Sequence, residues 1–128
     1  MGQQQLLLIV LGVIIVGIAV VVGINVFTAS STSSNRDAVI SDLTNLASMA
    51  QQFYRKPTAL AGGNNTFTGW TIPTQLATTG NGTYTVTVAA QSVTIVGTGN
   101  QTGNNGSSSV KVTMVVGPNS ITSTTINN

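Results

Sequence analysis

The chain has 128 residues, of which only 5% are charged, far below the roughly 25% of an average soluble protein. It contains no cysteine, histidine or glutamate, so the sequence predicts neither disulfides nor a metal or cofactor site. The only side-chain carboxylates, Asp37 and Asp42, are too far apart around a helix to work as an acid–base pair, and no enzyme is predicted. The four basic residues are scattered, which argues against nucleic-acid binding.

The first predicted element is an apolar helix within residues 1–29. No polar side chain occurs from Leu6 to Ile24, and about 20 such residues are enough to span a bilayer. In lipid the backbone must bond to itself, so a helix is expected even though valine and isoleucine dominate the run. No Lys or Arg precedes the run, which argues against a secretory signal peptide.

Three glycines interrupt this apolar run. Gly12, Gly17 and Gly23 are separated by five and six residues, so they do not form the four-residue small-residue spacing of close helix pairs. Two interpretations remain open. They are either glycines tolerated in a membrane helix, or positions that allow a packed helix to bend.

Residues 30–56 are predicted to form a polar joint followed by an amphipathic helix. The cluster SSTSSN is expected to interrupt the helix or to form a flexible joint, with Asn35 as the N-cap of the amphipathic helix. An apolar stripe then predicts a helix that packs on a sheet, with a coiled-coil seam as the less favoured alternative. Arg55, Lys56 and Pro57 predict where the helix ends. The stripe consists of Val39, Leu43, Leu46, Ala50 and Phe53, at alternating spacings of four and three.

Residues 57–128 are predicted to form a small antiparallel sheet. Period-two alternation indicates strands at 83–88, 92–97 and 110–116, with a weaker strand at 120–126. The polar stretch 97–109 is interpreted as a hairpin loop, and FTGW (67–70) as a cover for one end of the core. The fold class is therefore α+β, with a long N-terminal apolar helix, an amphipathic continuation and an antiparallel sheet domain.

Glycosylation is a further prediction for the third segment. Four Asn-x-Ser/Thr sequons occur in it, all expected in loops or turns, and the surrounding composition is neutral and rich in hydroxyl groups. The candidate sites are Asn64, Asn81, Asn100 and Asn105.

The order of these elements resembles type IV pilins and their relatives, the archaeal adhesive pilins and archaellins. The resemblance rests on QLLLIVLGVIIVGIAVVVGINVF (5–27) and NRDAVISDLTNLASMAQQFYRKP (35–57). It implies a subunit held in the cytoplasmic membrane by its apolar helix, processed by a prepilin peptidase and transferred by pilus assembly machinery into an extracellular helical filament. On this view a leader is already absent and Met1 is the mature first residue.

The resemblance also implies which residues make contacts between copies. Many bacterial relatives carry a glutamate near the start of the helix that pairs with a neighbour's amine, whereas this chain has Gln3, Gln4 and Gln5 behind Met1. A glutamine accepts a hydrogen bond but does not neutralise the amine. The expected filament core is Leu6, Leu7, Leu8, Ile9, Val10, Leu11, Val13, Ile14, Ile15, Val16, Ile18, Val20, Val21, Val22, Ile24 and Phe27.

The sequence is therefore compatible with two alternative functions. The first is a structural filament subunit whose partners are many copies of itself. The alternative is a membrane-anchored, exported module that binds a glycan or a partner and does not polymerise.

Overall fold

The computed structural model describes residues 2–128 and shows an α+β chain. Its first element, α1, is an α-helix from Gly2 to Arg55, followed by the 3-10 helix η1 (Thr58–Leu60) and the short helix α2 (Thr74–Ala77). The chain divides into two compact units, one ending at Ser31 and one beginning at Thr32. The strands are β1 (Thr78–Thr79), β2 (Gly82–Val88), β3 (Val93–Thr102), β4 (Ser109–Val116) and β5 (Ile121–Ile126).

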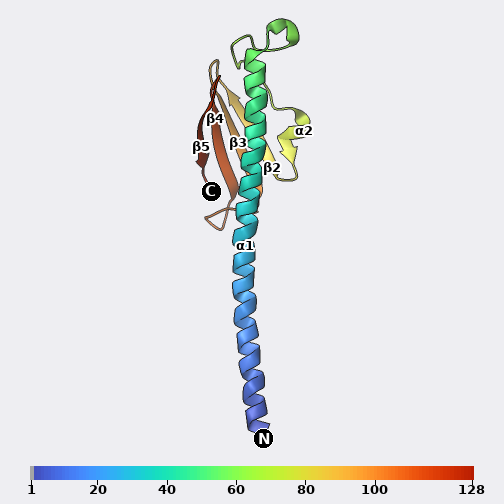
Figure 1. Cartoon of the computed structure of the whole chain (residues 1–128), viewed down its shortest axis with the longest axis vertical. Helices are drawn as coiled ribbons and strands as arrows, with labels where there is room; N and C mark the ends of the chain where they lie inside the picture. The colour runs from blue at the N-terminus through green and yellow to red at the C-terminus, as the bar shows by residue number, and fades with distance from the viewer. Residues whose placement is uncertain (1) are drawn as a thin grey trace. The chain divides into compact units, whose positions relative to one another are not determined.

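The strands form one antiparallel sheet in which neighbours along the chain are also neighbours in space, in the order β1-β2-β3-β4-β5 (Figure 1). β2 pairs with β3 along its whole length. The pairing of β3 with β4 is regular as far as Thr98, opposite Lys111, and then shifts before Thr102 meets Ser109. This local irregularity leaves part of the β3 backbone outside the regular ladder.

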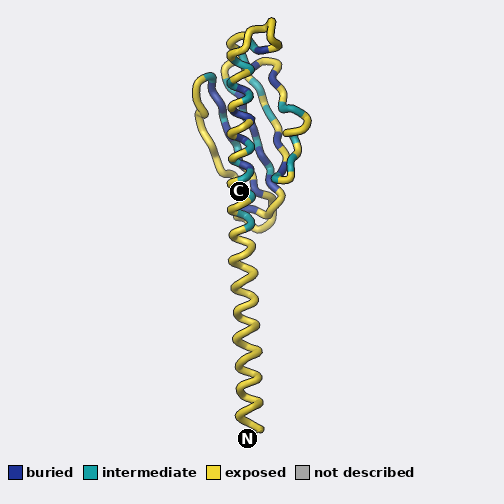
Figure 2. Tube along the Cα trace, turned by 45° about the vertical axis from the view of Figure 1, so that its right-hand side comes forward, coloured by how far each residue is buried: buried dark blue, intermediate teal, exposed yellow. Residues whose placement is uncertain are grey.

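The core of the second unit lies between one face of the sheet and one stripe of α1 (Figures 1 and 2). The predicted stripe is confirmed: Val39, Leu43 and Ala50 are fully buried, Leu46 is nearly so, and Phe53 is half-buried. The predicted cover also packs on this core. The buried hydrophobic residues outside the stripe are Ala47, Phe67, Trp70, Tyr84, Val93, Ile95, Val110, Val112, Met114 and Val116.

Gly97 on β3 allows α1 and the sheet to approach closely. A Cβ atom at this position would lie only 2.7 Å from Val39 Cγ1 and 3.0 Å from the Tyr84 ring, which is closer than carbon atoms normally approach. A larger residue here would push the helix away from the strands. The glycine is therefore part of the packing and not a turn residue.

The expected interruption at residues 30–35 is absent, because α1 continues through the whole polar cluster. Asn35 is consequently not an N-cap but lies inside the helix. Its carboxamide oxygen accepts hydrogen bonds from the backbone N–H of Asn100 (3.1 Å) and Gln101 (3.3 Å), and its Nδ2 donates to the Asn81 carbonyl (2.9 Å). Thr32 likewise donates to the Thr102 carbonyl (2.8 Å). These side chains bond to the sheet instead of competing for the helical backbone, so the helix is not broken.

The strands are found close to their predicted positions, with three differences. β3 extends to Thr102, so the predicted loop over 97–109 is confined to the residues between β3 and β4. β1 and α2 were not predicted, since elements of two and four residues are too short to show a periodic pattern. β5, at the edge of the sheet, is exposed along its whole length and not buried on one face, since none of its side chains belongs to the core. The predicted helix end is confirmed at Arg55.

Candidate functional site

The largest candidate interaction surface is the apolar part of α1. Every residue from Gly2 to Ser30 is exposed within the chain, as Figure 2 shows in yellow. All the residues predicted for a filament core belong to this surface, with exposed fractions between 53% for Leu11 and 73% for Phe27. Val26, which the prediction omitted, is 64% exposed and belongs to the same surface. The prediction omitted Val26 because it follows Asn25, which ends the uninterrupted apolar run.

This surface is apolar in every direction around the helix axis. Successive residues of an α-helix are rotated by about 100°, so the unbroken run from Leu6 to Ile24 leaves no polar stripe. A helix of this kind is stable only inside lipid or inside protein. The helix is also long and apolar enough to cross a membrane, and none of its most apolar stretch is buried within the chain. The surface therefore needs a partner that the chain itself does not provide.

The three glycines of the apolar run are all helical, and a Cβ atom at Gly12, Gly17 or Gly23 would meet no described residue within 4 Å beyond the adjacent helix backbone and chain neighbours. Glycine inside a helix costs about 0.8–1.0 kcal/mol relative to alanine. No contact among the described residues offsets that cost. Both interpretations, glycines tolerated in a membrane helix and positions that allow a packed helix to bend, stay open.

Gln3, Gln4 and Gln5 form the first turn region of α1 and are exposed, with no acidic residue beside them. Met1, predicted together with these glutamines to make polar contacts between copies, lies outside the described residues. The chain therefore presents a neutral cluster of amide groups at the start of the apolar surface. Each amide is able to donate and accept hydrogen bonds.

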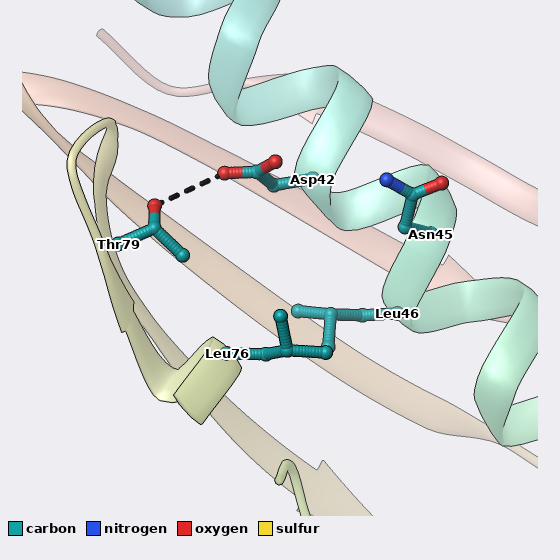
Figure 3. Close-up of a pocket in the computed structure, with 5 residues that line it drawn as sticks. All are labelled: Asp42, Asn45, Leu46, Leu76 and Thr79. Atoms are coloured by element: carbon teal, nitrogen blue, oxygen red, sulfur yellow. Dashed lines mark hydrogen bonds between the residues drawn. The ribbon is translucent and has the colours of Figure 1, made fainter. Parts of the chain in front are cut away.

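A polar cluster joins α1 to the β1–β2 turn in the second unit. Asp42 Oδ2 accepts hydrogen bonds from Tyr84 Oη (2.5 Å), Asn81 Nδ2 (3.1 Å) and Thr79 Oγ1 (3.2 Å). Figure 3 shows Asp42 and Thr79 facing each other across the gap between helix and turn, with Leu46 and Leu76 beneath them. The cluster holds the turn against the helix.

Burial and hydrogen bonding act in opposite directions on these groups. Burial alone would raise the pKa of the Asp42 carboxyl, but the three hydrogen bonds it accepts outweigh this, and the pKa is lowered. Burial, together with the bond to Asp42, raises the pKa of the Tyr84 phenol. Tyr84 therefore stays a donor and Asp42 an acceptor over the physiological pH range.

The hollow beside this cluster is too small for a ligand. It is lined by Asp42, Asn45, Leu46, Leu76 and Thr79 and has a volume of about 40 Å³. Small-molecule sites typically measure about 300–1,000 Å³. Among residues 2–128 there is also no group of three or more His, Cys, Asp or Glu side chains that could hold a metal ion. The cluster is best explained as a structural link.

The four predicted glycosylation sites lie in different surroundings. Asn64 is exposed in the turn after α1, and Asn105 is exposed between β3 and β4. Asn81 is half-buried in the β1–β2 turn. Asn100 lies within β3 and not in a loop, which corrects its predicted position.

Comparison of the chain with protein-family models, with curated proteins and with solved structures gives no match. The resemblance to pilins thus stands on the sequence stretches 5–27 and 35–57 and on the arrangement of elements. An apolar N-terminal helix and an antiparallel sheet packed against the continuation of that helix are both present.

Proposed function

We propose that the chain is a structural subunit of a helical extracellular filament that polymerises through its N-terminal apolar helix. The observation that carries this proposal is the apolar surface of α1, which is unpartnered around its whole circumference from Leu6 to Phe27. Packed copies of the same helix would cover it on all sides. The partner of each chain is then many copies of itself.

The physical driving force is burial of aliphatic side chains. Fully burying one Leu, Ile or Val side chain contributes about 1.5–3 kcal/mol relative to water. Before assembly the same residues are covered by lipid, so the cytoplasmic membrane is the proposed holding place of the subunit. In the membrane no hydrophobic force drives helices together, and their association depends on packing, which small residues such as Gly12, Gly17 and Gly23 favour.

The nearly uncharged sheet domain suits a dense polymer. The described residues after Lys56 carry one charged side chain, Lys111. Closely spaced copies would therefore meet little like-charge repulsion. Processing by a prepilin peptidase and transfer by assembly machinery belong to the same proposal, through the resemblance to pilins.

The test places a single charge in the centre of the apolar run, as Val16→Arg. One arginine at the centre of a membrane helix costs about 2.5–3.5 kcal/mol, and the run offsets this because each Leu, Ile, Val or Phe contributes about −0.3 to −0.6 kcal/mol. The variant should still enter the membrane. In a polymer core every copy would bury an unpaired charge, so sheared filaments seen by negative-stain microscopy should be lost.

Val16→Leu is the matched control and should give normal filaments. Thr85→Arg, on an exposed position of β2, should also be tolerated. Normal filaments carrying Val16→Arg would contradict the proposed core.

The second candidate is a membrane-anchored, exported binding module, favoured by the length and composition of α1, which are enough for one membrane crossing. The same experiment separates the two functions. A wild-type chain that stays in the membrane pellet after shearing, with no visible polymer, would support the anchored module.

A further inference from the structure

The four sequons of the chain differ in the state of the atom that receives a glycan. In N-glycosylation this atom is the carboxamide nitrogen, Nδ2, of asparagine. A sequon in a folded protein is available only if Nδ2 is exposed and is not already bonded to the protein. The surroundings of the four side chains can therefore be compared directly.

At two of the sequons Nδ2 is already used as a hydrogen-bond donor. Asn81 Nδ2 donates to Asp42 Oδ2 at 3.1 Å, within the half-buried cluster between α1 and the β1–β2 turn. Asn100 Nδ2 donates to the Gly80 carbonyl at 2.6 Å, and its own backbone N–H is held by Asn35. A sugar on either nitrogen would have to break the contact between turn and helix, or between turn and strand.

At the third sequon the oxygen of the carboxamide is held. Asn105 Oδ1 accepts hydrogen bonds from the backbone N–H of Ser107 and Ser108, both at 2.9 Å. It also accepts one from Asn128 Nδ2 at 3.2 Å. These three bonds fix the side chain inside the β3–β4 loop. These hydrogen bonds would have to break before a transferase could bind the sequon in an extended conformation.

The fourth sequon differs in its carboxamide, since only its Thr66 hydroxyl is engaged, donating to Thr68 Oγ1 (3.0 Å) and accepting from the Thr68 backbone N–H (3.2 Å). Asn64 is exposed, lies in the left-handed region with φ 53°, and makes no side-chain hydrogen bond with the described residues. Its backbone is fixed, since Asn64 N donates to the Lys56 carbonyl (2.8 Å) and Asn65 N to the Tyr54 carbonyl (2.7 Å). A rigid turn thus presents an unengaged carboxamide, and a glycan there would displace no contact of the side chain.

We propose that Asn64 is the N-glycosylation site of the folded chain. This proposal rests on the proposed extracellular function only in that the chain must meet the glycosylation machinery. Asn64 Nδ2 attacks C1 of a saccharide carried on a lipid phosphate or pyrophosphate. The N–C1 bond forms as the C1–O bond to the phosphate breaks. The phosphate leaves with the electron pair, and the amide proton passes to a base of the transferase.

The experiment compares transfer to the folded and to the denatured full-length chain. A purified oligosaccharyltransferase that modifies all four sequons of the denatured chain is given a lipid-linked oligosaccharide and the folded chain in detergent. Site-localising tandem mass spectrometry then measures the occupancy of each asparagine. In the folded chain, Asn64 should be occupied at least about tenfold more than Asn81 or Asn100, with Asn105 between them.

The matched controls change only the sequon. Asn64→Gln and Thr66→Ala should each abolish glycosylation at position 64. Thr66→Ser keeps the sequon and should retain it. Equal occupancy of Asn64 and Asn81 in the folded chain, or an unmodified Asn64, would overturn the proposal. The assay needs no polymer, so its outcome is independent of whether the chain forms filaments.

Discussion

Asp42 is a single carboxylate that accepts three side-chain hydrogen bonds, and this makes it the residue with the clearest expected pH effect. Its pKa in the folded chain is lowered from the ordinary value of 3.8, so the folded state binds this proton less readily than the unfolded state. The resulting stabilisation is complete above pH 3.8 or so and is lost as the pH falls through that value and below it.

Asp42→Asn should therefore reduce the loss of stability between pH 7 and pH 3. The measurement is chemical unfolding of the full chain in detergent at both pH values, followed by circular dichroism. Asp37→Asn, the same change at an exposed position of α1, is the matched control. An unchanged pH dependence in the variant would mean that the Asp42 cluster does not stabilise the fold.

At the scale of elements, the contact between α1 and the irregular part of β3 is sensitive to residue size. A Cβ atom at Gly99 would overlap with Asn35 Oδ1 and would lie 3.0 Å from Val110 Cβ. Gly99→Ala should therefore displace Asn35 and leave the N–H groups of Asn100 and Gln101 without their acceptor. We expect a loss of about 1–3 kcal/mol in the free energy of unfolding.

The control is Gly80→Ala, since a Cβ atom there would meet nothing within 4 Å. Thermal or chemical unfolding of both variants gives the comparison. Equal stabilities of Gly99→Ala and Gly80→Ala would show that Asn35 and β3 do not form the close contact described.

The same contact shows why part of the fold could not be predicted from the sequence. Alternating residues in Val110–Val116 and the stripe from Val39 to Phe53 have a local period, so both elements were predicted correctly. The helical state of the SSTSSN cluster depends instead on partners such as Thr102, 70 residues away along the chain. Local propensity favours an interruption of the helix at this cluster, but the tertiary hydrogen bonds stabilise the continuous helix.

The candidate surface of α1 was predictable for a related reason. A wholly apolar helix is recognised from composition alone, without any knowledge of its neighbours. Whether an individual asparagine side chain is free to be modified cannot be recognised from composition. Four sequons look alike in the sequence, and only the bonds of Asn81, Asn100 and Asn105 distinguish them from Asn64.

For the whole molecule, the division into two units leads to a prediction about truncation. All the buried core residues that the structure describes lie between Val39 and Val116, and the described part of the unit ending at Ser31 contributes none of them. A fragment of residues 32–128 should therefore fold without detergent, remain monomeric and unfold cooperatively. Size-exclusion chromatography and circular dichroism measure these properties.

The full chain without detergent is the matched comparison and should associate through α1. A truncated fragment that is unfolded would mean that the apolar segment is needed for folding. A truncated fragment that still forms polymers would place the assembly contacts in the sheet domain.

The packing of the second half of α1 along the sheet also has a mechanical consequence. Because Val39, Leu43 and Leu46 lie in a row between helix and strands, a pull along the axis of this part of α1 loads their contacts together, in shear. The hydrogen bonds of Asn35 to β3 lie at the beginning of this row and would be loaded with them. A pull in this direction is therefore opposed by these contacts and hydrogen bonds together.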